Sequence, residues 1–200
     1  MEMIEVESTQ NLERARSLIE CYKLLELYNL GSPLHRGDLL RACVVFLHST
    51  IEELVRNLFL SRLPHCDRSV LNEIPFSSHE ANHRARGVLL GDLLENFQGK
   101  LVENVIIDSI NAYVDVLNIN NTDQLSAHFV KVDVEISPLR SLMSDLNTLM
   151  FRRHQIVHQM DRSDRLDPDR EPVTEITLDL VEKWFQATEE LVNRVVAQVT

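Results

Sequence analysis

The clearest pattern in the chain is a long run of apolar residues at helical spacing in its first third. From about Asp38, which can cap a helix, to Leu63, apolar residues recur every three or four positions, as in an amphipathic helix. Residues 39–47 are apolar almost all round, which favours a central place in a helical bundle. The apolar stripe comprises Leu40, Cys43, Val44, Leu47, Ile51, Leu54, Val55 and Leu58.

The same spacing predicts four further helices. Gly31, Ser32 and Pro33 separate the first from the second, and Pro64 ends the second. Ser137 and Pro138 provide an N-cap followed by proline at the first helical position. The predicted segments are residues 9–30, 91–117, 138–160 and 177–199.

Residues 118–137 give a mixed pattern. Val130, Val132, Val134 and Ile136 alternate with charged residues, which is typical of a strand, but one short strand cannot form a sheet. Five glycines and six prolines in 200 residues also favour helix. The sequence therefore predicts an all-α fold, an antiparallel bundle of about four to five helices in a single domain over residues 1–200.

Charge restricts where a polyanion could bind. The formal net charge of −11 argues against a broad basic surface for nucleic acid. Residues 151–170 nevertheless contain five arginines against four aspartates, whereas residues 171–200 contain six acids against two basic residues. Any site for a polyanion is therefore expected in residues 151–170.

Other features predict a cytoplasmic protein with no membrane association. No apolar run approaches the roughly 20 residues that cross a bilayer, and the acidic N-terminus lacks the basic region of a secretory signal. Cys21, Cys43 and Cys66 are odd in number and widely spaced, which predicts buried free thiols in a reducing compartment rather than disulfides.

Arg153 occupies an unusual position in the helix that follows Pro138. At 100° per residue it falls in the middle of an apolar face, whereas Arg152 falls well round the helix, as a solvated residue would. A buried arginine is costly unless its guanidinium is paired or lies in an interface or cleft. Two interpretations remain open: a structural ion pair, or a guanidinium held to bind phosphate.

His158 lies five residues after Arg153, about 140° round the same helix. One helix therefore cannot direct both side chains at one phosphate. Two copies facing each other across a two-fold axis could combine an arginine and a histidine in a shared groove. The spacing thus favours a homodimer.

The run Arg153-His154-Gln155-Ile156-Val157-His158 matches the R-x4-6-H motif of HEPN domains. With Asp161-Arg162 after it, Trp184 in a late helix and the Glu52-Glu53 pair before it, the chain resembles the RiboL-PSP branch of that superfamily. The resemblance implies a metal-independent endoribonuclease of toxin–antitoxin or phage-defence type, without a cofactor. The alternative is a non-catalytic HEPN module that binds RNA, a nucleotide or protein.

The resemblance also implies roles for particular residues. His158 would be the general base on the ribose 2'-hydroxyl, Arg153 would stabilise charge on the phosphate, and His154 would orient or contact the substrate. Glu52 and Asp161 would support them. The implied partners are RNA, a second copy of the chain, and an inhibitory antitoxin or defence partner.

Competing patterns carry less weight. Residues 79–83, His-Glu-Ala-Asn-His, match the H-E-x-x-H zinc pattern but lack apolar neighbours and a third ligand. His154 and His158 form an i, i+4 pair that could bind a metal only with further ligands. Arg41, His48 and Glu52 share a face of the second helix, for which a solvated strip or a structural network is favoured, unless Glu52 reaches Arg153.

Overall fold

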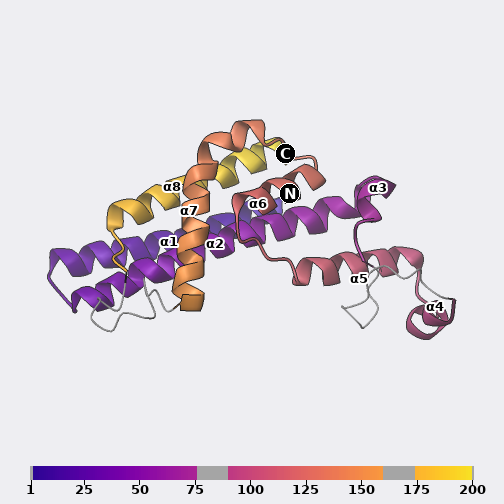
Figure 1. Cartoon of the computed structure of the whole chain (residues 1–200), viewed down its shortest axis with the longest axis horizontal. Coiled ribbons are helices and arrows are strands. Elements are labelled where there is room, and N and C mark those ends of the chain that lie inside the picture. The colour runs from indigo at the N-terminus through magenta and orange to yellow at the C-terminus, as the bar shows by residue number, and fades with distance from the viewer. Residues whose placement is uncertain (1, 76–89, 160–173, 200) are drawn as a thin grey trace. The chain divides into compact units, whose positions relative to one another are not determined.

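The structure is a computed structural model, and it describes residues 2–75, 90–159 and 174–199. Every regular element in these ranges is helical, which confirms the predicted all-α class (Figure 1). The long helices are α1 (Glu2–Leu27), α2 (Pro33–Arg62), α5 (Val102–Asp115), α7 (Met143–Gln159) and α8 (Leu178–Val199). The short ones are α3 (Arg68–Leu71), α4 (Leu90–Phe97), α6 (Thr122–Lys131) and the 3-10 turns η1 (Leu63–His65) and η2 (Ser137–Leu142).

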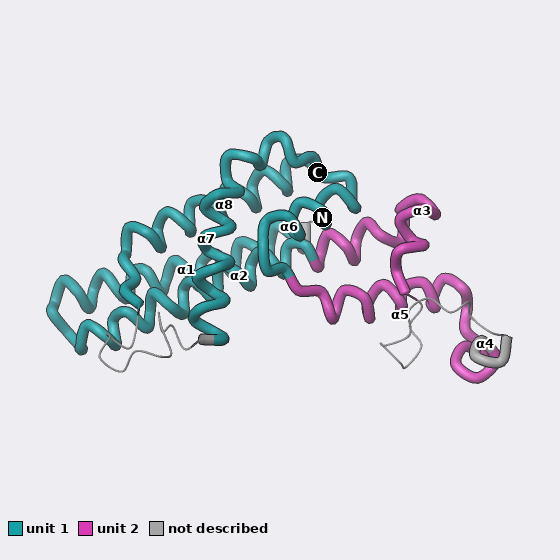
Figure 2. Tube along the Cα trace, viewed as in Figure 1, with its two compact units in different colours: residues 1–55, 119–200 teal, residues 56–118 magenta. Residues whose placement is uncertain are grey.

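The chain divides into two compact units (Figure 2). Unit 1 contains residues 1–55 and 119–200, and unit 2 contains residues 56–118. A compact unit is not by itself an independently folding domain, so the single domain over residues 1–200 stays a prediction. All the described residues with predicted chemical roles lie in unit 1.

Unit 1 is assembled around α8. This helix packs against α1 and α7, and α7 crosses it steeply (Figure 1). Trp184 is almost fully buried, and its indole N–H donates to the hydroxyl oxygen of Thr148 at 2.9 Å, which links α8 to α7. A buried indole needs such an acceptor because its N–H cannot reach water. The core also contains Leu12, Ile19, Leu47, Ile51, Phe129, Leu146, Leu149, Leu191 and Val195.

Unit 2 is held by contacts between the end of α2 and α5. The rings of Phe59 and Tyr113 stack with centroids 6.2 Å apart, and Arg56 pairs with Asp115 at 3.4 Å. Buried Leu63, Val105 and Ile110 complete a small apolar core. This unit contains none of the described residues of the R-x4-6-H run.

The strand-like pattern before Ser137 was misleading. Asn121 caps α6 by accepting a hydrogen bond from the N–H of Gln124 at 2.9 Å, and Leu125 and Phe129 are buried one helical turn apart. Asp133 then adopts a left-handed conformation (φ 55°), and the N–H of Val134 donates back to the carbonyl of Phe129. Helical hydrogen bonds satisfy this backbone locally, whereas a lone strand would have left it unpaired.

Helix boundaries differ from the predictions at two proline positions. α2 begins at Pro33 rather than near Asp38, because proline fits the first helical position. Ser137, the predicted N-cap, instead begins a 3-10 turn that Ile136 precedes, and the α-helix starts only at Met143. The predicted 91–117 segment contains two helices, α4 and α5, separated by Gly99 with φ 78°.

The cysteine prediction is only partly correct. Cys43 is buried, and burial raises the pKa of its thiol to about 12, so it is unreactive. Cys66 is half-buried, and Cys21 is exposed because α1 turns it away from the core. No helix within the described residues is long and apolar enough to span a bilayer.

Leu191→Ala is expected to lower the free energy of unfolding by about 2–5 kcal/mol, because it opens a cavity between α8 and its neighbours. Asn193→Ala, an exposed position on the same helix, should change it by less than about 0.5 kcal/mol. Urea unfolding followed by circular dichroism measures both. Equal losses would show that α8 does not pack as described.

Candidate functional site

The inward face of α7 carries two arginines. Leu146, Leu149 and Met150 are buried on this face, and Arg153 is half-buried one turn further on. Arg152 is the more buried of the two, with only 7% of its surface exposed. The prediction that Arg152 is solvated was therefore wrong.

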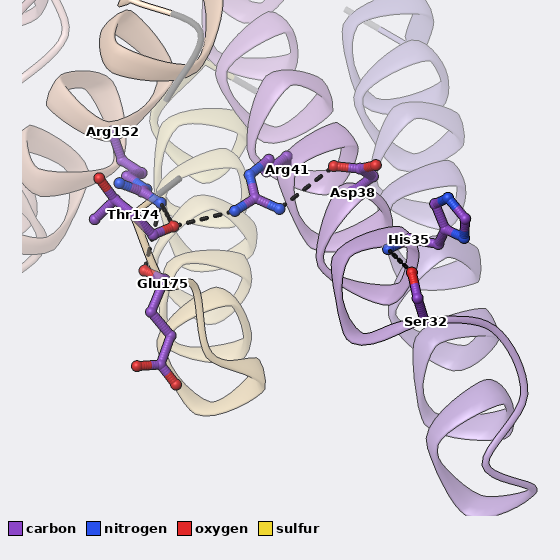
Figure 3. A network of polar contacts seen from close by, with 7 residues as sticks. All are labelled: Ser32, His35, Asp38, Arg41, Arg152, Thr174 and Glu175. Atoms are coloured by element: carbon purple, nitrogen blue, oxygen red, sulfur yellow. Dashed lines mark hydrogen bonds and ion pairs between the residues drawn. The ribbon is translucent and has the colours of Figure 1, made fainter. Parts of the chain in front are cut away.

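Arg152 is buried because the segment before α8 offers it backbone acceptors. Its Nη2 donates to the carbonyl of Thr174 at 2.8 Å and to that of Glu175 at 3.4 Å (Figure 3). Its Nη1 donates to Gln155 at 3.3 Å. A guanidinium can be buried when its N–H groups find such acceptors. The helical angle of Arg152 did not reveal these acceptors, which lie more than 20 residues away in the sequence.

Arg41 of α2 reaches the same carbonyl. Its Nη2 donates to the Thr174 oxygen at 3.1 Å, while its Nη1 lies 3.4 Å from Asp38 (Figure 3). A Cβ on Gly37 would lie 2.7 Å from Nη1 of Arg41, so glycine leaves room for this side chain. We refer to Arg41, Arg152 and the Thr174 carbonyl as the arginine clamp; it ties α2 and α7 to the segment that leads into α8.

The charge of Arg153 acts on a second polar group on α2, centred on Glu52. Burial alone would raise the pKa of this carboxyl, but the hydrogen bond and charge of His48, the charge of Arg153 and the N–H of Ile119 together bring it below its ordinary value. Glu52 is therefore ionised and acts electrostatically on Arg153. This placement agrees with the predicted supporting role of Glu52, although the role itself stays a prediction.

His48 is not part of a solvated strip. Its side chain is 1% exposed, Nε2 lies 2.8 Å from the carbonyl oxygen of Ile119, and Nδ1 lies 3.5 Å from Oε2 of Glu52. His48 and Glu52 thus form the structural network that the sequence left open. Arg41, on the same helix, belongs to the clamp.

The histidines of the motif lie on the outward side of α7. His154 and His158 are exposed, and their ring centroids are 4.8 Å apart with planes inclined by 47°. Phe151, which is 62% exposed, lies on the same side one turn before His154. Arg153 and His158 of one chain therefore point to different sides of α7, as the helical angle predicted.

Several predicted residues lie outside the described ranges. Asp161, Met160, His79 and His83 belong to this set, and their predicted roles stay predictions. Among the residues that the structure describes, no group of three His, Cys, Asp or Glu side chains is placed to hold a metal ion.

Comparisons with known proteins give one result. A family model described as RiboL-PSP-HEPN matches residues 9–200, almost the whole chain. No curated protein and no solved structure matches it. The match therefore shows the family of the chain, but it does not show an activity.

Arg152→Met is expected to lower the free energy of unfolding by about 2–3 kcal/mol, since methionine keeps apolar bulk but loses the hydrogen bonds of the guanidinium to the carbonyls of Thr174 and Glu175. Arg16→Met is the matched control, because Arg16 pairs with Glu189 on the surface and such pairs contribute only about 0–1 kcal/mol. Denaturant unfolding compares the two. If Arg152→Met lowers the free energy of unfolding less than Arg16→Met does, the arginine clamp does not stabilise the fold.

Proposed function

Because the chain belongs to the RiboL-PSP-HEPN family, we propose that it is a metal-independent endoribonuclease of toxin–antitoxin or phage-defence type. The observation that carries the proposal is a half-buried Arg153, whose charge helps to keep Glu52 ionised, together with an exposed His158 on the same helix. A positioned guanidinium and an accessible imidazole are the groups that cleavage of RNA through its 2'-hydroxyl requires.

In the proposed reaction His158 takes the proton of the ribose 2'-hydroxyl. The 2'-oxygen attacks the adjacent phosphorus, the P–O5' bond breaks, and the departing 5'-oxygen takes up a proton. Arg153 stabilises the extra negative charge on the phosphoryl oxygens in the transition state, for which a planar guanidinium is suited. The products are a 2',3'-cyclic phosphate and a 5'-hydroxyl. His154, exposed one turn before His158, orients or contacts the RNA.

A homodimer resolves the separation between Arg153 and His158. Because they lie on different sides of α7, one copy does not direct both at one phosphate. Two α7 helices related by a two-fold axis would place an arginine and a histidine along a shared groove. Phe151 and Val157, exposed beside the histidines, supply apolar surface for this contact.

Such an enzyme would harm its own cell if unchecked. We therefore propose that the protein is cytoplasmic. Its activity would be controlled by an inhibitory antitoxin or by the trigger of a defence system, as the family resemblance implies.

The second candidate is a non-catalytic HEPN module that binds RNA, a nucleotide or another protein. The formal net charge of −11 favours it, because an acidic protein repels the RNA backbone except at a local basic site. The two candidates differ in whether RNA is cut.

The purified full chain is expected to cleave RNA in the presence of EDTA, and Arg153→Ala and His158→Ala are expected to lower the rate by at least about 100-fold. His35→Ala is the matched control, because His35 is an exposed histidine at the start of α2. Gel analysis of total RNA and end-group analysis of short oligonucleotides provide the measurements.

A single 2'-deoxy substitution at the cleaved nucleotide should abolish cutting there. If intact RNA is recovered with the wild-type chain across these substrates, the non-catalytic module is the better description. Equal rates for wild type and His158→Ala would instead remove the proposed base.

Phe151→Glu is expected to convert a dimer into a monomer at micromolar concentration, because it puts a charge on the proposed interface. RNA cleavage should fall with the dimer fraction, while the free energy of monomer unfolding stays within about 0.5 kcal/mol, as for other exposed positions. Val130→Glu, exposed on α6, is the matched control. If light scattering shows that the wild type is a monomer at this concentration, the composite site is wrong.

A further inference from the structure

The outward side of α7 carries two histidines one helical turn apart. His154 and His158 are separated by four residues, and both side chains are exposed. Their ring centroids lie 4.8 Å apart, with the ring planes inclined by 47°. Residues four apart on a helix project from the same face, so the two imidazoles stand beside each other. The proposed function gives each ring a role with RNA, but it does not require the rings to lie this close.

The separation of the rings matches what two imidazoles need in order to bind one metal ion. Zinc binds imidazole nitrogen at about 2.0–2.1 Å, usually with tetrahedral coordination. Two imidazoles on one zinc ion at the tetrahedral angle therefore have centroids roughly 5 Å apart. The 4.8 Å between His154 and His158 agrees with this separation. Small side-chain rotations would direct one nitrogen of each ring at a common ion.

The packing of α7 holds this pair in place before any ion binds. On the inward side, Nη2 of Arg152 donates to the carbonyl of Thr174 at 2.8 Å. The hydroxyl of Thr148 accepts from the indole of Trp184 at 2.9 Å. Ligands on a helix that is already fixed lose less conformational entropy on binding than ligands on a loop. Arg153 points to a different side of α7, so its charge does not lie between the two histidines of its own chain.

One chain supplies only half of a stable zinc site. Protein zinc sites have four ligands, or three and a water, whereas no three His, Cys, Asp or Glu side chains among the described residues are grouped to hold an ion. The proposed dimer brings two outward sides of α7 together across a two-fold axis. Symmetry then provides two further imidazoles, which complete a tetrahedral set of four. Imidazole suits zinc, whereas magnesium prefers oxygen ligands.

We propose that His154 and His158 form half of a zinc site that a second copy of the chain completes, and that the bound ion inhibits RNA cleavage. A metal ion occupies the imidazole lone pair with which His158 would take the proton of the 2'-hydroxyl. Zinc therefore links the two copies and blocks their base, while cleavage itself needs no metal. The inhibition and the shared site rest on the proposed function, whereas chelation by the pair rests on α7 alone.

Zinc binding to the full chain tests the site without RNA. Chelator-treated wild type is titrated with zinc in competition with a coloured indicator, and light scattering follows association. We expect one ion per two chains, and association at a protein concentration at least about 10-fold lower than without zinc. His154→Ala and His158→Ala each remove two ligands from the dimer, so they should weaken binding by more than the about 10- to 100-fold that loss of an outer-shell partner costs. His35→Ala, which removes an exposed histidine of α2, should bind zinc as the wild type does.

Phe151→Lys distinguishes a shared site from a site within one chain. It keeps both histidines but puts a charge on the proposed interface, and lysine, unlike glutamate, adds no carboxylate that could bind zinc. Its zinc affinity should fall as in the histidine variants. One ion per chain at wild-type affinity in Phe151→Lys would overturn the shared site. Zinc that is kept in His154→Ala but lost in His83→Ala would assign the ion to residues 79–83 and overturn the proposal.

Cleavage assays test the inhibition. One zinc ion per two chains is expected to lower the rate of RNA cleavage by the wild type about 100-fold, as loss of a general base does, and EDTA should restore the rate. Magnesium at the same concentration should leave the rate unchanged, and His35→Ala should be inhibited like the wild type. If zinc binds in this ratio and the rate does not change, the inhibition is wrong. If the wild type cuts no RNA without zinc, the proposed function fails, and the stoichiometry and association alone decide the zinc site.

Discussion

The constraint on which unit 1 depends is that polar side chains buried among its helices must find partners inside the chain. Arg152 and His48 lie at positions that water barely reaches, and burying a polar group without a hydrogen bond costs free energy. Both find backbone carbonyls: Thr174 for the guanidinium and Ile119 for the imidazole. These carbonyls belong to irregular segments, whose oxygens are not already used in helical hydrogen bonds. The polar core is therefore built from helices that supply donors and connections that supply acceptors.

The two networks together determine how α7 is rotated. Arg152 donates to the segment before α8, and Arg153, 100° further round the helix, is half-buried where its charge acts on Glu52 of α2. With both arginines engaged on the inward side, the outward side is left to Phe151, His154 and His158. An α7 turned by half a turn would expose the guanidiniums and bury the histidines, and it would also separate Trp184 from Thr148. The placement of the motif thus follows from the packing of unit 1.

Helical periodicity predicted the all-α class and the long helices because burying apolar stripes is a local property of the sequence. It also predicted that Arg153 and His158 point to different sides of α7. It failed where a distant partner decides the outcome: Arg152 is buried because Thr174 and Glu175 offer carbonyls, and no local pattern encodes that contact. The strand-like alternation after residue 129 failed for a related reason, since a strand needs a partner and the capped helix α6 does not. Glu52 could be named as a supporting residue, but the contribution of His48 required the position of Ile119.

The acidic net charge of the chain limits how it could bind RNA. With a net charge of −11, long-range attraction to RNA is weak, so binding depends on contacts at close range. A single α7 offers an arginine whose charge is already partly balanced by Glu52, and that is a poor phosphate site by itself. Two facing copies would double the local positive charge and would join each arginine to a histidine from the other chain. Activity that requires association would then rise steeply with concentration, and blocking the outward face of α7 would silence it without touching Arg153.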